Sequence, residues 1–94
     1  MEHQVQHTDT STKGSYFIEE GGTKIAEMTY SKVGTDRIII DHTEVDERFK
    51  GKGLGELMVR KSVGDARDKK ISIVPLCPFA RAIFNKNDEL KDVL

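Results

Sequence analysis

The residues best suited to chemistry form a glycine-rich segment with flanking lysines, here called the glycine loop: Lys50, Gly51, Lys52, Gly53, Leu54 and Gly55. Glycines at alternate positions let the backbone turn sharply and bring several N–H groups together. The residues from Leu54 onward have a helical pattern, so the orphan amides and the positive dipole end of a helix N-terminus coincide with this turn. The lysines add positive charge. The segment therefore predicts a binding site for a phosphate or pyrophosphate.

Two common phosphate-binding motifs do not fit the glycine loop. A Rossmann fingerprint has a different glycine spacing and opens a βαβ unit, whereas the N-terminal half of this chain has hairpin patterns. A Walker A loop requires Gly-Lys-Ser/Thr at a fixed spacing that is missing here. The remaining alternative is a structural turn in which glycine only permits a positive φ.

Length and composition indicate one small cytoplasmic domain over residues 1–94. The chain is 33% charged and 36% hydrophobic, and its length suffices for one core but not for two. Lys plus Arg (15) and Asp plus Glu (16) nearly cancel, which gives no support to a general nucleic-acid binder. No apolar run approaches the ~18 residues of a membrane span. No signal peptide is visible, and a single cysteine excludes an internal disulfide.

The first 14 residues are polar and predict a flexible or weakly ordered segment, with a short edge strand near Val5 as the alternative. His3 and His7 have the spacing of metal ligands on one helix face. Nothing nearby completes such a site, so we expect no metal ion.

Three strand patterns follow, separated by polar turns that contain glycine: Ser15–Glu19, Thr23–Tyr30 and Arg37–Val45. In the second strand, alternation places Ala26, Met28 and Tyr30 on one face. In the third, the run Ile38–Ile40 is apolar on both faces, as in a central strand covered on both sides. The three strands predict an antiparallel meander.

A helix is expected over residues 54–70, because its apolar residues recur on one arc: Leu54, Met58, Val59, Val63 and Ala66. Ile71–Val74 is a further strand pattern, and a strand–helix–strand unit implies a parallel return beside Arg37–Val45. Pro78 is a favoured first residue of a second helix. That helix would face the core with four residues, Phe79, Ala80, Ile83 and Phe84. The predicted fold class is α+β.

Residues 48–53, Arg-Phe-Lys-Gly-Lys-Gly, fit the Arg/Gln-x-x-Gly-x-Gly/Ala signature of the GNAT superfamily of acyl-CoA-dependent N-acetyltransferases. The order strand, loop, helix, strand, helix from Arg37 to Phe84 also matches the core of that family. The segments Asp41–Val45 and Pro75–Phe79 resemble those of a short stand-alone GNAT-like subfamily. The resemblance implies a minimal GNAT-like fold, with a mixed, mostly antiparallel sheet, a splayed parallel strand pair and two main helices.

The resemblance also implies acetyl-CoA as the cofactor. Backbone amides from Lys50 to Glu56 would hold its pyrophosphate, and its pantetheine arm would lie in the splay between the parallel strands. The expected cofactor-binding residues are Thr43, Val45, Arg48, Lys50, Gly51, Lys52, Gly53, Leu54, Gly55, Glu56, Pro78, Phe79 and Phe84.

Acetyl transfer to an amine requires a base and a proton for the leaving thiolate. His42 and Glu44 are two apart in one strand, hence on one face, and either could act as the base. Cys77, the single thiol, could accept the acetyl group or protonate the departing CoA. Each has a structural alternative: a hydrogen-bonded histidine, a solvent-facing carboxylate and a small buried apolar residue.

Two departures from the family pattern bear on the mechanism. The tyrosine that many members use as general acid is replaced by phenylalanine, at Phe79 and Phe84. The two helices that shape the acceptor pocket of full-size members have no room in this chain. We therefore expect transfer to an unknown amine, with two alternatives. One is a non-catalytic acyl-CoA-binding or sensor module that works with a partner, and the other is a plain interaction domain.

Overall fold

The computed structural model describes residues 3–94. Its five strands are β1 (Gln6–Asp9), β2 (Lys13–Glu20), β3 (Thr23–Val33), β4 (Arg37–Val45) and β5 (Ser72–Pro75). The α-helices are α1 (Leu54–Lys69) and α2 (Pro78–Lys86), and the 3-10 helices are η1 (Glu47–Phe49) and η2 (Asp88–Val93). Among the helices of residues 3–94, none is long and apolar enough to cross a membrane.

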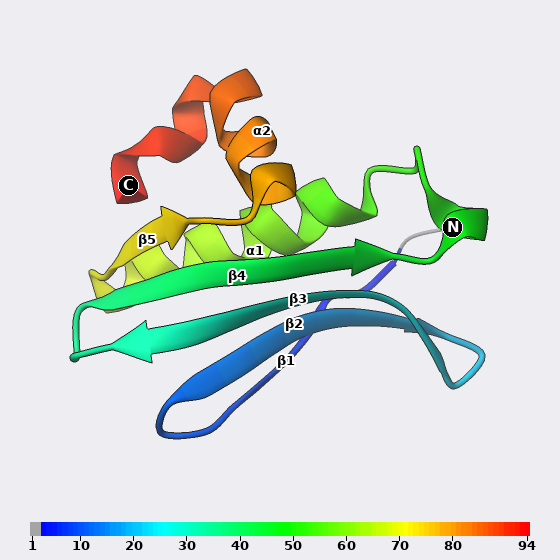
Figure 1. Ribbon diagram of the computed structural model, residues 1–94, viewed down its shortest axis with the longest axis horizontal. Helices are drawn as coiled ribbons and strands as arrows, with labels where there is room; N and C mark the ends of the chain where they lie inside the picture. Colours follow the sequence, from blue (N-terminus) through cyan, green and yellow to red (C-terminus); the bar gives the residue numbers. More distant parts are fainter. Residues whose placement is uncertain (1–2) are drawn as a thin grey trace.

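The five strands form one mixed sheet in the order β1-β2-β3-β4-β5 (Figure 1). Neighbouring strands are antiparallel from β1 to β4, and β5 returns parallel to β4 after the α1 crossover. The predicted α+β class, the meander and the parallel return are all confirmed. Strand β4, helix α1 and helix α2 begin at the predicted residues, Arg37, Leu54 and Pro78.

The core lies on one side of the sheet. The buried residues of α1, α2 and η2 form one continuous cluster with the inward-facing strand residues. The strand members of this cluster include Tyr16, Ile18, Ala26, Met28, Tyr30, Ile38, Ile40 and Ile73. The apolar arc predicted for α1 is buried throughout, from Leu54 to Ala66. Hydrophobic burial on this side is therefore what holds the helices to the sheet.

The opposite side of the sheet is open, contrary to the expectation that β4 is covered on both faces. Ile38 and Ile40 are buried, but Ile39, which points the other way, is only half-buried. Ser31, which pairs with Ile39, and Phe17 and Thr29, which lie farther along the same face, are half-buried too. Within residues 3–94 no helix packs there, because the α1 crossover and α2 both lie against the core side.

A β-bulge in β4 decides which side chains reach the core side. Tyr30 of β3 pairs with Ile40 and the preceding Thr29 pairs with His42, so Asp41 is an extra residue. An extra residue in a strand reverses the alternation beyond it. Thr43, which pairs with the buried Met28, therefore faces the core side.

The N-terminal segment is more ordered than its polar composition predicts. Residues 6–9 form β1 and residues 13–14 already belong to β2, so the alternative of an edge strand is the one observed. The prediction of a flexible segment was wrong because His7 acts as an inward-facing residue: its ring stacks on Tyr16 at 4.1 Å between centroids. Residues 1–2 lie outside the described chain.

One predicted core position in α2 is also corrected. Ala80, Ile83 and Phe84 are buried, but Phe79 is 46% exposed. Phe79 lies in the first turn of α2, where its ring turns toward the start of α1 and contacts Gly55. Its position is thus at the rim of the core, next to the glycine loop.

Candidate functional site

The glycine loop forms a sharp turn directly before α1. Gly51 and Gly53 have φ of 81° and 78°, a left-handed conformation that favours glycine. Gly53 is the N-cap of α1, and no side chain caps this end of the helix. The first amides of a 16-residue helix are therefore available to an anion, with the positive end of the dipole behind them.

The charged side chains around the loop are mostly paired with one another. Arg48 contacts Asp46 at 3.1 Å, Lys50 contacts Glu47 at 3.2 Å, and Glu56 contacts Arg60 at 2.9 Å. These pairs are exposed and so contribute little to stability. The Glu56 carboxylate is held along the helix by Arg60, and Lys50 is paired with Glu47, so the loop offers an anion mainly its amides and the ammonium group of Lys52.

The two parallel strands separate beyond Ile40, as predicted. The last pair in their register is Ile40 with Pro75, and the N–H groups of Leu76 and Cys77 both donate to Ile40 O, at 3.0 and 3.1 Å. Strand β4 continues to Val45 without β5 beside it.

This separation leaves one edge of β4 open. The N–H of Asp46 donates to Ile25 O on β3 at 2.7 Å. Because backbone groups alternate between the two edges of a strand, those of Val45 and Thr43 point away from β3, toward the gap left by β5. They can pair with an extended ligand that carries amides.

A cavity of about 800 Å³ joins the glycine loop to this open edge. Of the expected cofactor-binding residues, those that line it are Thr43, Val45, Lys50, Gly51, Gly53, Leu54, Gly55, Glu56 and Phe79. Arg48, Lys52 and Pro78 are exposed outside it, and Phe84 is buried in the core. The volume is sufficient for a ligand of cofactor size.

Gly55 and Phe79 bring the loop and α2 into direct contact. A Cβ atom on Gly55 would overlap the Cε1 and Cζ atoms of the Phe79 ring. Glycine is thus required at this position for close packing. The contact closes the wall of the cavity between the start of α1 and the start of α2.

Cys77 is the N-cap of α2 and is 7% exposed. Its Sγ lies 3.4 Å from Oγ1 of Thr43. Burial alone raises the pKa of the Cys77 thiol, but hydrogen bonds from the Thr43 side chain and from the backbone N–H groups of Ala80, Phe79 and Thr43 outweigh it, so the pKa is lowered overall. Donors of this kind favour the thiolate, the nucleophilic form of cysteine.

The model of the GCN5-related N-acetyltransferase family matches residues 15–93, nearly the whole length of the fold just described. The chain belongs to the GNAT family. GNAT enzymes use acetyl-CoA as their acyl donor. No curated protein is significantly similar to this chain in sequence.

Solved structures share the fold of this GNAT domain. A GCN5-like protein from Staphylococcus aureus is 30% identical with a TM-score of 0.72, and the match covers 94% of this chain and 85% of that one. A ribosomal-protein-alanine N-acetyltransferase from Brucella melitensis is 14% identical with a TM-score of 0.69, over 82% and 62%. A predicted acetyltransferase from Clostridium acetobutylicum, solved with acetyl-CoA, is 16% identical with a TM-score of 0.61, over 80% and 56%. The GNAT domain thus spans less than two thirds of the last two proteins, which show the fold alone.

The structure does not bring His42 and Cys77 into one pair. His42 Nε2 lies 2.7 Å from Glu44 Oε1, and both side chains are largely exposed. Because the bulge turns Thr43 to the core side, His42 and Glu44 face the open side of the sheet. The expectation that these two share a face holds, whereas the partner of Cys77 is Thr43.

The Thr43 hydroxyl is the site group that sequence reasoning missed, since Thr43 was expected as a cofactor-binding residue and not as a partner of Cys77. The signal available was a threonine within a strand whose next neighbours, His42 and Glu44, are polar. The bulge that aims it at Cys77 depends on pairing with β3.

The two tyrosines lie away from the cavity. Tyr16 and Tyr30 pack against His7 on the core side of β2 and β3, and burial raises the pKa of Tyr30 to about 12. Within residues 3–94, then, no tyrosine lines the site. No group of three or more His, Cys, Asp and Glu side chains in this part of the chain could hold a metal ion.

Proposed function

We propose that this GNAT domain binds acetyl-CoA in the 800 Å³ cavity and transfers the acetyl group to an amine, with Cys77 as an intermediate carrier. The observation that carries the proposal is the open edge of β4, which runs from the uncapped glycine loop to the hydrogen-bonded thiol of Cys77. Acetyl-CoA supplies an acetyl group activated as a thioester. Each part of the cavity offers groups that suit one part of this molecule.

The glycine loop and the β4 edge are assigned to binding. The amides from Lys50 to Glu56 suit the pyrophosphate. The backbone groups of Thr43 and Val45 suit the amides of the pantetheine arm. Phe79, in contact with Gly55, supplies an apolar wall beside them.

Cys77, His42 and Glu44 are assigned to chemistry. The Cys77 thiol, whose pKa its hydrogen-bond donors lower, loses its proton and its Sγ attacks the thioester carbonyl, so that CoA leaves as a thiolate and takes up a proton. The amine nitrogen then attacks the acetyl carbon, the bond to Sγ breaks and the Cys77 thiolate is restored. His42, hydrogen-bonded to Glu44, takes the proton that the amine nitrogen loses. An amine bound beside His42 on the open side of the sheet reaches Cys77 through the gap beyond Ile40, where β5 no longer lies beside β4.

An amide-resolved NMR titration with acetyl-CoA tests the binding role. The expected shifts concentrate at residues 50–56, 43–45 and 77–79. Intact-mass analysis after incubation then tests for one acetyl group, which should be present on the wild-type protein and absent from Cys77→Ser. If millimolar acetyl-CoA shifts no amide of the glycine loop, the proposed function is wrong, and the glycine loop is only a turn.

A non-catalytic acyl-CoA-binding module is the second candidate, and it is favoured by the large exposure of the His42 and Glu44 side chains to solvent. The two candidates differ in turnover. Steady-state CoA release with a panel of primary amines indicates an enzyme. Cofactor binding with no CoA release above the buffer rate indicates the module.

A further inference from the structure

A second cavity lies at the other end of α1, between its C-terminal half and the β3–β4 end of the sheet. Its volume is about 350 Å³. It shares no lining residue with the 800 Å³ cavity that the proposed function assigns to acetyl-CoA, so the proposed function does not account for it. A volume of this size accommodates a small organic molecule.

Part of the lining of the second cavity is apolar and aromatic. Ile38, Ala66 and Ile71 supply aliphatic surface, and the rings of Tyr16 and Tyr30 supply aromatic surface. These residues come from β2, β3, β4, α1 and the turn that follows α1. An apolar molecular body would be protected from water here.

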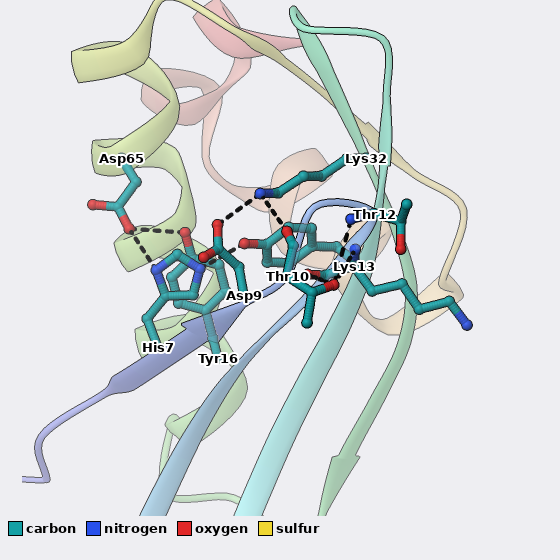
Figure 2. A network of polar contacts seen from close by, with 9 residues as sticks. His7, Asp9, Thr10, Thr12, Lys13, Tyr16, Lys32 and Asp65 are labelled. Atoms are coloured by element: carbon teal, nitrogen blue, oxygen red, sulfur yellow. Dashed lines mark hydrogen bonds and ion pairs between the residues drawn. The ribbon is translucent and has the colours of Figure 1, made fainter.

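The two tyrosine rings are held in place by a polar network. Tyr16 OH donates to Asp65 Oδ2 at 2.8 Å, and Tyr30 OH lies 2.6 Å from Nε2 of His7. Figure 2 shows His7 of β1 and Tyr16 of β2 both directed at Asp65 on α1. The walls are therefore already formed before any ligand binds.

The charged residues of the lining are predominantly positive. Lys32, Arg37 and Lys69 line the cavity together with one carboxylate, that of Asp65. The Asp65 carboxylate is engaged by the Tyr16 hydroxyl and lies 3.6 Å from Lys61, a residue outside the lining.

Two of these cations are free to meet a ligand. Lys32 is held by Asp9 at 2.8 Å. Across residues 3–94, no carboxylate lies within 4.0 Å of Arg37 or Lys69. Positive charge thus gathers at this cavity in a chain whose net charge is −1.

We propose that the second cavity binds a small organic carboxylate, with Arg37 as the principal anchor and Lys69 as a second positive charge. The planar fork of arginine matches a carboxylate with two parallel hydrogen bonds. Lys69 lies in the last turn of α1 and also offsets the negative end of the helix dipole. The tyrosine rings and the aliphatic floor then contact the body of the ligand.

An NMR titration with phenylacetate tests the proposal, since this probe combines a carboxylate with an aromatic ring. The expected shifts lie at residues 34–38 and 65–69. Arg37→Gln should weaken binding by roughly tenfold or more, because a hydrogen bond to a charged group contributes about 1.5–3 kcal/mol. Lys86→Gln is the matched control, as it removes an exposed cation at the end of α2, and should leave the affinity unchanged.

Two further probes separate the contributions of charge and body. 2-Phenylethanol has a similar body without the charge, and inorganic phosphate has the charge without the body. Both should bind more weakly than phenylacetate. Equal affinity for phenylacetate and 2-phenylethanol, equal affinity for phenylacetate and phosphate, or unchanged binding by Arg37→Gln would each overturn the proposal. None of these measurements depends on ligand binding in the 800 Å³ cavity.

Discussion

At the scale of single residues, the thiol of Cys77 is surrounded by hydrogen-bond donors. The Thr43 hydroxyl and three backbone amides all favour its thiolate. A cysteine kept only as a small apolar residue would gain nothing from such donors. This surrounding suits the chemical role proposed for Cys77.

Thr43→Val should raise the pKa of the Cys77 thiol, because valine has the same shape and lacks the hydroxyl. With one hydrogen bond worth about 0.5–1.5 kcal/mol, the rate of alkylation by iodoacetamide at neutral pH should fall roughly twofold to tenfold. The measurement is the pH dependence of alkylation. Thr29→Val, which removes a hydroxyl bonded to Asp41 on the open face, should leave the rate unchanged. An unaltered thiol pKa in Thr43→Val would remove the argument for activation.

His7 should make the folded state less stable as pH falls below neutrality. Burial lowers the pKa of His7, against the opposing charges of Asp65 and Asp9. The unfolded chain, with a histidine pKa of about 6.5, therefore binds the proton more readily. The contribution of neutral His7 is complete above that pH and is lost as pH falls from there through the lower folded-state pKa.

Urea unfolding between pH 5 and 8 measures this effect. His7→Phe keeps a ring against Tyr16 and should show a weaker loss of unfolding free energy over that range than the wild-type protein. His42→Asn is the control, since it removes an exposed histidine and should retain the wild-type dependence. Identical pH profiles for His7→Phe and wild type would show that β1 is held independently of His7 ionisation.

At the scale of elements, the start of α1 packs closely against the start of α2 because residue 55 is glycine and has no Cβ atom. Gly55 is buried in the first turn of α1 and the Phe79 ring occupies the space that a side chain would need. The Phe79 ring therefore fills the space between the starts of the two helices that line the 800 Å³ cavity.

Gly55→Ala should destabilise the domain by about 1–3 kcal/mol, the usual cost of overpacking. Phe79→Ala in the same chain should recover part of that loss, because the ring no longer blocks the methyl group. The measurement is the unfolding free energy of both single variants and the double variant. Strictly additive changes in unfolding free energy would mean that the Phe79 ring does not clash with the new methyl group at position 55.

Gly64→Ala is the matched control in the same helix. No atom lies within 4 Å of a Cβ at Gly64, so alanine should gain the helix propensity that glycine lacks, about 0.5–1 kcal/mol in favour of folding. Opposite signs for Gly55→Ala and Gly64→Ala would separate packing from propensity.

At the scale of the whole molecule, the sheet has a covered side and an open side, and the 800 Å³ cavity lies where β4 and β5 separate. On the covered side, Thr43 lines the cavity, and Cys77, which is not among the lining residues, lies next to Thr43. The open side carries His42 and Glu44. The proposed transfer would use groups from both sides through the gap beyond Ile40.

Acetyl-CoA should stabilise the whole domain against unfolding, because its proposed site combines α1, β4 and α2, which are brought together only in the folded chain. At a ligand concentration about 100 times Kd the gain is about 2.7 kcal/mol, which raises Tm by several degrees in a domain of this size. Thermal unfolding with and without acetyl-CoA measures it, with free adenosine as the control. An unchanged Tm at millimolar acetyl-CoA would contradict the assigned cavity.

Local pattern was enough to predict most of the elements. Alternation in Thr23–Tyr30, the apolar arc from Leu54 to Ala66, and Pro78 at a helix start are properties of neighbouring residues, and the structure confirms all three. The glycine loop was predictable for the same reason, since positive φ at Gly51 and Gly53 follows from the residue type.

The tertiary structure decided what depends on pairing between distant segments. The bulge at Asp41 arises from its register with β3 and sends Thr43, rather than His42, to Cys77. Strand β1 is ordered because His7 meets Tyr16, Tyr30 and Asp65, none of which its own neighbours specify. The open side of the sheet likewise follows from both helices packing on one face. The periodicity of apolar residues indicates which of them share a face of a helix or strand. Only the folded chain determines which faces pack against one another.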